Sequence, residues 1–490
     1  MFMKRKSLTI ALIVCFLMLE TMAFGQANAW ENITHIFKEN PEYQKGQVSW
    51  SIVDLKTGIE VESFQSEKRL IPASTLKLFT GAMILDRLGK STVLETKVSL
   101  TGEIRRSKLK GDLIIKGAGD PSLGSGLAGS INADSVLSQI TNALLRKEIE
   151  SIHGDLIIDP HVLPYDHTVI PRKFIWEDIG SYYGAGTWGL NWRNNEYTVR
   201  FSVKSETEPA AVIDSISSWA KQLKINPQVK VVKGNPKEIY FYGGPFEREI
   251  LAKGELIAGS SITERGSLPN PPLIFAEELK QYLLEKGIEI HGEIRFENTA
   301  EWKTDSLTSI KSPTIENMVK EIEFQSNNLF AETLSKLTSD YKSEEYPSGK
   351  QIGEWLKARW GNQFSDALFV DGSGLSRNNL LSTKNQTQLL YRLSTDSLAF
   401  STFFNVIPQS GKEGTVRNLP KIEGMRVKSG SMANVRAYSG YFMDADNSPQ
   451  AFAIIINNVN LPSEIIKSQI IEFLTQASKT SFTAIGLKNK

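Results

Sequence analysis

The chain has 490 residues, and its 56 lysine and arginine side chains almost balance its 55 aspartate and glutamate side chains. The formal charge of +1 argues against a nucleic-acid-binding protein, because such proteins normally carry a clear basic excess. With 40% hydrophobic residues the chain is globular rather than disordered. Its length predicts about two to four domains. The single cysteine, Cys15, excludes internal disulfides and a cysteine-ligated zinc site.

Residues 1–29 have the pattern of a secretory signal. Basic residues at positions 4–6 precede an apolar run from Leu8 to Leu19, and Ala27-Asn28-Ala29 offers the small–x–small sequence that a signal peptidase cleaves. The apolar run is too short for a typical membrane span, and an uncleaved anchor is the alternative. We therefore expect an exported protein of the periplasm or cell envelope, with loose membrane association left open.

The next segment, residues 30–92, predicts the first part of a domain. Residues 30–38 have the pattern of a short helix. Polar and apolar residues alternate over Gln47–Val53 and Gly58–Phe64, which indicates a β-hairpin. Apolar residues then recur at helical spacing over Thr75–Leu88, which predicts a helix.

Residues 93–306 differ in character and predict inserted, mostly β domains. Strand patterns alternate closely with glycine and proline, and two amphipathic helices interrupt them. We expect one or two domains here, the second nested in the first. The predicted strands are Val93–Leu100, Gly111–Ile115, Gly154–Ile158, Thr198–Val203 and Lys237–Tyr242, and the helices are Ser135–Arg146 and Pro272–Lys286.

Residues 307–490 return to helical patterns and predict the second part of the divided domain. Helices are expected at 314–323, 327–340, 348–360 and 383–396, followed by strands Ala437–Asp444 and Ala451–Val459 and a last helix, Pro462–Ser478. The apolar stripe of this last helix predicts burial against the two strands, with a position on a membrane surface as the alternative. The simplest arrangement of the divided domain pairs the strands from both ends of the chain in one antiparallel sheet.

Several short motifs do not carry a function. Residues 184–189 match GxGxxG, but they neither follow an apolar strand nor open a helix, so they do not predict dinucleotide binding. Gly89-Lys90-Ser91 ends like a phosphate-binding loop but lacks its first glycine. The five histidines stop at His291, which disfavours a Ser-His-Asp hydrolase, and the loose group from His153 to His167 is a weak metal candidate.

Ser74-Thr75-Leu76-Lys77 places a serine and a lysine three residues apart at a helix N-terminus. Residues i and i+3 share one helix face, so the amine of Lys77 can reach the hydroxyl of Ser74. A serine hydroxyl becomes a good nucleophile when a neighbouring base takes its proton, and lysine can be that base when burial disfavours its charged form. Alone this motif also fits a capping serine followed by a surface lysine.

Two further motifs change that balance. Ser326-Asn327-Asn328 gives S-x-N just before a predicted helix, Asn328–Leu337, and Lys428-Ser429-Gly430 begins a stretch of small residues ahead of a predicted strand. The order S-x-x-K, S-x-N, K-[ST]-G along one exported chain is the set found in β-lactamases and penicillin-binding proteins.

Longer segments resemble one family within that group. The chain is similar to the D-alanyl-D-alanine carboxypeptidases among the class C low-molecular-mass penicillin-binding proteins, which carry extra domains between the first two motifs. The resemblance implies an α+β fold, in which a penicillin-binding transpeptidase/β-lactamase-like domain holds inserted mostly-β domains. It rests on residues 72–78, 111–115, 117–121, 326–332 and 371–377.

The resemblance also implies roles for single residues, with peptidoglycan stem peptides as substrates, β-lactams as covalent inhibitors and no metal or cofactor. Catalysis would use Ser74, Lys77, Ser326, Asn328 and Lys428, and substrate binding would use Ser429, Gly430 and Ser431. A pocket for the stem-peptide side chain would involve Trp176, Asp178, Tyr183, Arg377 and Met432, although an ordinary packed aromatic loop explains the first three equally well. The family usually has K-T-G, so Ser429 leaves the relative affinity for β-lactams open.

Two other functions compete with this hypothesis. One is a β-lactamase or esterase on the same scaffold, which would hydrolyse its acyl-enzyme with penicillin within minutes. The other is a non-catalytic cell-wall-binding protein, which would be expected to have lost at least one motif residue. The balance between carboxypeptidase and endopeptidase action, the oligomeric state and any partner proteins stay open.

Overall fold

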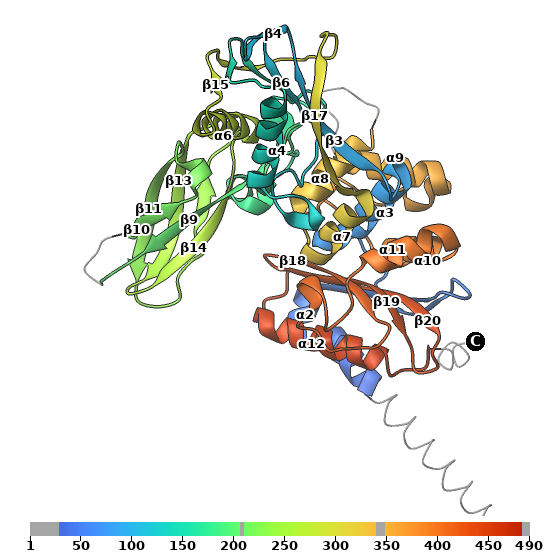
Figure 1. Ribbon diagram of the computed structural model, residues 1–490. Helices are drawn as coiled ribbons and strands as arrows, with labels where there is room; N and C mark the ends of the chain where they lie inside the picture. The colour runs from blue at the N-terminus through green and yellow to red at the C-terminus, as the bar shows by residue number, and fades with distance from the viewer. Residues whose placement is uncertain (1–28, 206–209, 340–347, 483–490) are drawn as a thin grey trace, which may run out of the picture. The chain divides into compact units, whose positions relative to one another are not determined.

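The computed structural model of the protein describes residues 29–205, 210–339 and 348–482, which form two compact units (Figure 1). Unit 1 contains the chain up to Thr75 and from Asn379 onward, and unit 2 runs from Leu76 to Asn378. The predicted secretory signal lies outside the described residues except for Ala29.

Unit 1 is built on a five-stranded sheet in which every neighbouring pair is antiparallel. The first and last parts of the chain meet here, since β1 pairs with β20 and places Trp50 opposite Ile454. The predicted hairpin and the predicted pairing of the chain ends are therefore confirmed. In sheet order the strands are β18 (Arg426–Met432), β19 (Val435–Met443), β20 (Pro449–Asn457), β1 (Gln47–Asp54) and β2 (Glu60–Phe64).

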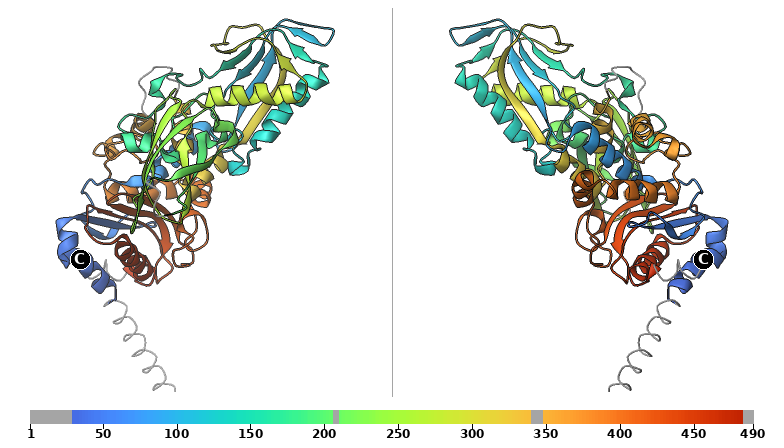
Figure 2. Two further views of the ribbon diagram at one scale, coloured as in Figure 1. Left: turned by 90° about the vertical axis from the view of Figure 1, so that its left-hand side faces the viewer. Right: turned by 90° about the vertical axis from the view of Figure 1, so that its right-hand side faces the viewer.

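Both faces of this sheet are covered, because side chains alternate along each strand. On one face Trp50 of β1 packs on Phe473 of α12 (Ser463–Ala477). On the other face the hydroxyl of Ser49 hydrogen-bonds Thr383 of α10 (Thr383–Ser394) at 2.7 Å. Figures 1 and 2 show α12 and α10 on opposite faces of the sheet. The other helices of the unit are residues 29–39, α2 (Pro41–Lys45) and α11 (Ser397–Val406).

The last helix is buried as predicted. Ile466, Ile470, Phe473 and Leu474 of α12 belong to the core between the helix and the sheet, whereas Ile465 is 43% exposed. Within the part of the chain that the structure describes, no helix is long and apolar enough to cross a membrane.

Unit 2 contains a group of packed helices around α3 (Lys77–Leu88). A 3-10 turn, Ala73–Leu76, leads directly into α3, so the predicted helix begins as a tighter turn than expected. Gly89 ends α3 with its N–H bonded to the carbonyl of Leu85. The helix contacts α7 (Ile315–Gln325), α8 (Asn328–Leu337) and α9 (Ser348–Trp360), all near their predicted positions.

The β-rich part of unit 2 contains a five-stranded and a four-stranded sheet. Helices α4 (Ala133–Arg146) and α6 (Pro271–Glu285) contact the five-stranded sheet through β17 and β8 and belong to the same core. This sheet runs in the order β16 (Ile294–Phe296), β8 (Leu156–Asp159), β6 (Leu113–Lys116), β3 (Val93–Leu100) and β17 (Asp305–Thr314). The smaller sheet consists of β15 (Glu289–Ile290), β7 (Ser151–Ile152), β5 (Lys108–Lys110) and β4 (Glu103–Arg105).

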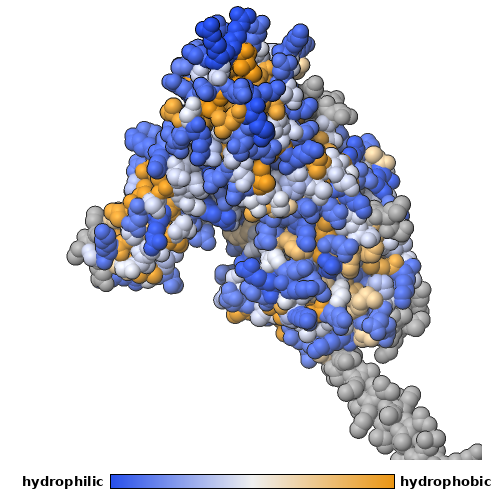
Figure 3. All heavy atoms as spheres, viewed as in Figure 1, coloured by the Kyte–Doolittle hydropathy of each residue, from blue (hydrophilic) through white to orange (hydrophobic). Residues whose placement is uncertain are grey.

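A further lobe of unit 2 is formed by two three-stranded sheets. Phe241 of one sheet packs on Tyr197 and Phe201 of the other, at 5.7 and 6.2 Å between ring centroids. Figure 3 shows hydrophobic residues on the visible face of this lobe. Among the exposed hydrophobic residues of its strands are Val212, Ile257 and Ile262. One sheet contains β10 (Val212–Ile216), β9 (Glu196–Ser202) and β14 (Ser261–Ser267), and the other contains β11 (Lys224–Val232), β13 (Glu249–Ile257) and β12 (Tyr240–Tyr242).

Several elements were not predicted individually, among them β11 and β13 of the inserted region. Three other differences concern an edge strand, a helix and a motif. Strand β17 was not predicted, because its residues are mostly polar and half-exposed at the edge of the sheet. Helix α11 was also not expected. Lys428-Ser429-Gly430 lies within strand β18 rather than ahead of a strand, because the small residues after it continue the extended pairing with β19.

Candidate active site

The residues of the predicted site are divided between the two units. Unit 1 carries Ser74 and the β18 residues Lys428, Ser429, Gly430, Ser431 and Met432. Unit 2 carries Lys77, Ser326, Asn328, Arg377 and the segment with Trp176, Asp178 and Tyr183. The chain passes from one unit to the other between Thr75 and Leu76, so Ser74 and Lys77 stay three residues apart on consecutive helical turns.

Ser74 follows a residue with unusual backbone geometry. Ala73 has a φ of 47°, a left-handed conformation that is uncommon for a residue with a side chain and is often held at functional sites. Thr75 secures the turn, because its hydroxyl donates to the carbonyl of Pro72 at 2.8 Å and accepts from the side-chain amide of Gln386 at 3.0 Å. Ser74 itself is partly exposed, which the predicted role of nucleophile requires.

Lys77 is fully buried at the start of α3. Its Nζ donates to Oδ1 of Asn328 at 2.6 Å and to the backbone carbonyl of Ser373 at 2.5 Å. The structure thus brings together the lysine of the first motif and the asparagine of the second. Both of these partners are neutral oxygens, so they fix the amine without supplying a direct counter-charge.

The second motif lies in the short connection between α7 and α8. Ser326 ends α7 in a left-handed conformation with φ 60° and ψ 33°. Asn327 caps α8 by accepting from the N–H of Phe330, and its amide donates to Asn194 at 3.1 Å. The amide of Asn328 donates to the carbonyl of Tyr183 at 2.8 Å. Asn328 therefore links Lys77 to the segment that carries the predicted side-chain pocket.

The third motif runs beside the backbone of Ser74. A Cβ added to Gly430 would lie 2.8 Å from the carbonyl oxygen of Pro72 and 3.0 Å from the backbone nitrogens of Ser74 and Thr75. Only glycine leaves room for this approach. Lys428 is fully buried, and the hydroxyl of Ser429 lies 2.9 Å from that of Thr415.

The segment of the predicted side-chain pocket contains a partly buried carboxylate. Burial raises the pKa of Asp178, while a hydrogen bond from Tyr183 and the positive charge of Arg377 act in the opposite direction. Burial, followed by the charge of Asp178, also raises the pKa of Tyr183. Trp176 is 53% exposed on the same short helix, α5 (Trp176–Ile179). The structure thus brings Asp178, Tyr183 and Arg377 together through a hydrogen bond and an attraction between opposite charges. Met432, the remaining residue of the predicted pocket, belongs to unit 1.

Three residues near Lys77 received no role from the sequence. Glu332 and Asp371 are buried carboxylates that bind backbone N–H groups of the loop whose Ser373 carbonyl holds Lys77. Segments 326–332 and 371–377 contain all three residues and carried the family resemblance, but nothing in residue type predicts that a backbone carbonyl would meet the lysine.

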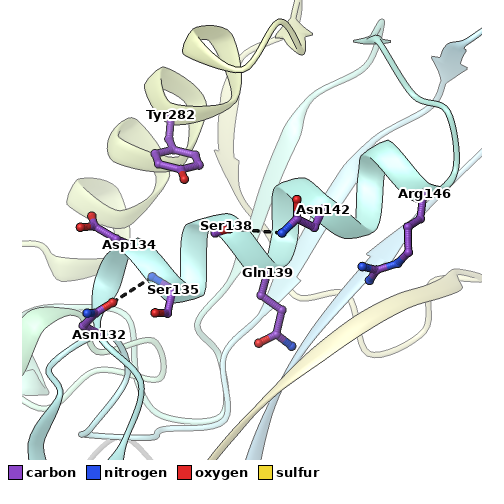
Figure 4. A pocket seen from close by; sticks show the side chains of 8 residues that line it. All are labelled: Asn132, Asp134, Ser135, Ser138, Gln139, Asn142, Arg146 and Tyr282. Carbon is purple, nitrogen blue, oxygen red and sulfur yellow. Dashed lines mark hydrogen bonds between the residues drawn. The ribbon is translucent and has the colours of Figure 1, made fainter.

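Two other features of the described residues lie apart from these motifs. An open groove of about 590 Å³ runs beside α4, and its lining contains no residue of the predicted site (Figure 4). Two of its polar side chains bond each other, since the amide of Asn142 donates to the hydroxyl of Ser138 at 3.2 Å. Over residues 29–205, 210–339 and 348–482 there is no group of three or more His, Cys, Asp or Glu residues suited to hold a metal ion.

Comparisons with known proteins agree over most of the chain. A sequence profile of the D-Ala-D-Ala carboxypeptidase 3 (S13) family matches residues 29–477. D-alanyl-D-alanine carboxypeptidase DacB of Haemophilus influenzae is 22% identical over 469 residues, which cover 90% of this chain and 92% of the relative. D-alanyl-D-alanine carboxypeptidase of Actinomadura sp. is 24% identical over 447 residues, 87% of this chain and 80% of the relative.

A solved structure shares the fold. The crystal structure of penicillin binding protein 4 (dacB) from Haemophilus influenzae matches with a TM-score of 0.78 at 19% identity, over 91% of this chain and 99% of that chain. The same protein in complex with a β-lactam matches with a TM-score of 0.73. The predicted fold class, an α+β penicillin-binding and β-lactamase-like fold, is thereby confirmed.

Proposed function

Because the chain belongs to the D-Ala-D-Ala carboxypeptidase 3 (S13) family, it is a serine-type carboxypeptidase, and we propose that Ser74 is its nucleophile. The hydroxyl oxygen of Ser74 bonds to the carbonyl carbon between two D-alanines of a peptidoglycan stem peptide. The peptide C–N bond breaks, terminal D-alanine leaves as an amine, and water then hydrolyses the acyl-enzyme. The same steps would open a cross-link when a second stem peptide is the leaving group.

Lys77 is the general base in this proposal. The observation that carries it is the full burial of its amine between the Asn328 side chain and the Ser373 carbonyl. Burial disfavours the charged form of lysine, which makes the amine able to take the proton of Ser74. Ser326 relays that proton to the leaving amine, and Asn328 fixes Lys77 and hydrogen-bonds the substrate amide.

The β18 residues bind the end of the substrate. Lys428 and Ser429 supply a positive charge and a hydroxyl for the terminal carboxylate, and the N–H groups of Ser74 and Ser431 form the oxyanion hole. The narrow space between Gly430 and the backbone of Ser74 supports this arrangement. An oxyanion-hole donor typically contributes about 3–4 kcal/mol to the reaction barrier.

Covalent labelling with a fluorescent penicillin tests the nucleophile. We expect Ser74→Ala to abolish labelling, whereas Ser468→Ala, which changes an exposed serine of α12 in the same unit, should label like the wild type. Labelling that persists in Ser74→Ala would refute the assignment. The lifetime of the labelled enzyme separates the remaining hypotheses, since a β-lactamase would lose the label within minutes.

The side-chain pocket is a second part of the proposal. A carboxylate such as Asp178 suits an ammonium group at the end of the stem-peptide side chain, and its link through Tyr183 to Asn328 supports a position beside the reacting bond. Asp178→Ala should slow turnover of peptides with a free side-chain amine more than that of capped peptides. The matched control is Glu177→Ala, the exposed neighbouring carboxylate on α5. An equal loss of turnover on both kinds of peptide would refute the proposed pocket.

The balance between the two peptidase activities is open to direct measurement. Purified uncross-linked and cross-linked muropeptides are digested separately, and the product masses are determined. Release of D-alanine from the first indicates carboxypeptidase action, and conversion of dimers to monomers indicates endopeptidase action. A substrate outside the cytoplasm also fits the export that the N-terminal sequence predicts.

A further inference from the structure

Asp371 is a buried carboxylate to which the mechanism above gives no task. Its Oδ1 accepts from the N–H of Gly374 at 2.7 Å, and its Oδ2 accepts from the N–H of Ser376 at 2.6 Å. Both oxygens therefore bind the backbone of one loop, residues 371–376. A buried carboxylate must be satisfied by such bonds, so its position and that of the loop are fixed together.

One peptide unit connects Asp371 to Lys77. The carbonyl of Ser373 and the N–H of Gly374 belong to the same planar peptide. The N–H binds Asp371, and the carbonyl accepts from the amine of Lys77 at 2.5 Å. Hydrogen bonds in series polarise one another, so the bond to the carboxylate makes this carbonyl a stronger acceptor.

Glu332 of α8 holds the preceding peptide in the same way. Its Oε1 accepts from the N–H of Ser373 at 2.6 Å, and the carbonyl of that peptide, from Gly372, accepts from the hydroxyl of Thr80 at 2.5 Å. Thr80 lies one turn after Lys77 on α3. Two successive peptides thus bind successive turns of α3, and a buried carboxylate lies behind each of them.

We propose that Asp371 is a positioning residue for the general base. It holds the Ser373 carbonyl against Lys77 and, through the peptide, stabilises the positive charge that the amine gains when it takes the proton of Ser74. This inference rests on the proposed function, because it assumes that Lys77 accepts that proton. No bond is made or broken at Asp371.

Charged groups on the elements that contact α3 and Asn328 also contribute to any pH profile. Glu323 lies against Gly81, since a Cβ added there would be 2.7 Å from its Oε1. These groups are unchanged in the variants below, so a difference from the wild type reports the altered residue. Besides Glu323 of α7, they are Glu332 and Lys336 of α8, and Asp178 and Arg377 near Tyr183.

The test is the rate constant of acylation by penicillin, measured against pH in the full-length enzyme. Asp371→Asn removes the negative charge and should lower the rate constant about tenfold or more, the range expected for a hydrogen bond to a charged group. Without that charge the amine holds its proton less tightly, so the acid limb of the profile should move to lower pH. The amount of penicillin bound per enzyme at completion gives the fraction of active protein. The rate constant is calculated for that fraction, so unfolded protein does not affect it.

Ser348→Ala is the matched control. The hydroxyl of Ser348 accepts from the N–H of Gly372 at 2.9 Å and donates to Glu332, so its loss loosens the same loop without changing a charge or the Ser373–Gly374 peptide. The acid limb should stay at its wild-type position. An equal displacement in Ser348→Ala would show that Asp371 acts only by supporting the loop.

A second variant covers the case in which Asp371→Asn does not fold. Asp371→Glu keeps the charge but displaces the carboxylate by one methylene, so it should lower the rate constant and leave the acid limb in place. Wild-type rates in both Asp371 variants would overturn the inference. Ser74→Ala tests the proposed function separately, because labelling that persists there refutes the nucleophile whatever Asp371 does.

Discussion

Ser326 has a left-handed backbone, with a φ of 60°, although it carries a side chain. Glycine adopts this conformation without steric penalty. The free energy of unfolding of Ser326→Gly, measured by denaturant titration, should therefore be about 1 kcal/mol higher than that of Ser326→Ala. Both variants remove the hydroxyl that we propose as the proton relay. Turnover of a D-alanyl-D-alanine peptide should therefore fall about 100-fold or more in both. If Ser326→Gly keeps wild-type turnover, the hydroxyl is not the relay.

Gly430 is the second residue at which backbone space is limiting. A side chain there would press on the carbonyl of Pro72 and on the backbone of Ser74, neither of which can rotate away. Gly430→Ala should lower the free energy of unfolding by about 1–3 kcal/mol, as overpacking does, and slow acylation by penicillin. Gly353→Ala is the control, because its added methyl meets open space on α9 and should stabilise the protein by about 0.5–1 kcal/mol. Unimpaired acylation in Gly430→Ala would contradict the close approach.

At the same scale, the sequence can propose residues that would act through side chains, but it gives no sign of a backbone partner. Ser74, Lys77 and Asn328 are proposed because the chemistry expected of them depends on residue type and spacing. Ser373 offers only its carbonyl to Lys77, and any residue type has a carbonyl. A backbone partner of this kind therefore has no signature in the sequence and needs coordinates.

Among the elements, α8 carries three polar side chains at a spacing of one turn: Asn328, Glu332 and Lys336. The amine of Lys336 donates to the hydroxyl of Thr187 at 2.6 Å, which ties the helix to the segment before β9. Burial lowers the pKa of Lys336 from 10.5 to about 8, although Glu332 and Asp166 act in the opposite direction. The helix therefore contains a lysine whose charged form is disfavoured by folding.

This shift predicts how stability depends on pH. Between about pH 8 and pH 10.5 the unfolded chain binds more protons at this lysine than the folded chain, so its contribution to the free energy of unfolding rises with pH. Below that window the cost of the buried charge is fully present. The difference in melting temperature, wild type minus Lys336→Met, should therefore increase from pH 7 to pH 10. A constant or decreasing difference would show that the amine is not disfavoured in the folded protein.

The elements that were predicted differ in their hydrophobic patterns from those that were missed. Helix α12 and strand β20 present apolar residues at the spacing of their structure, and both were predicted. Strand β17 contains Asp305–Thr314, whose mostly polar residues pair with β3 on one side only. An edge strand buries few residues, so it shows no alternation that a sequence can reveal.

For the whole molecule, chain order alone predicts an insertion between two parts of one domain, at residues 93–306. This division stays a prediction. In the structure the sheets of this region lie in one compact unit with the helices before and after them, from Leu76 to Asn378. The continuous core of the sheets and the contacts of β17 with α7 explain why. Sequence patterns mark where secondary structure changes, whereas compact units follow packing between distant segments.

The predicted export concerns the whole chain, and the residues behind the expected cleavage site make it testable. Trp30 would be the first residue after cleavage behind Ala29, and it is buried against Phe473 and Phe482, at 4.9 and 5.4 Å between ring centroids. We expect N-terminal sequencing of the protein from a cell-envelope fraction to begin at Trp30, and this form to bind penicillin fully. Ala29→Arg should block cleavage, because signal peptidase requires a small residue there. The precursor should then accumulate. An unchanged mature N-terminus in that variant would show that the signal peptidase cleaves at another site.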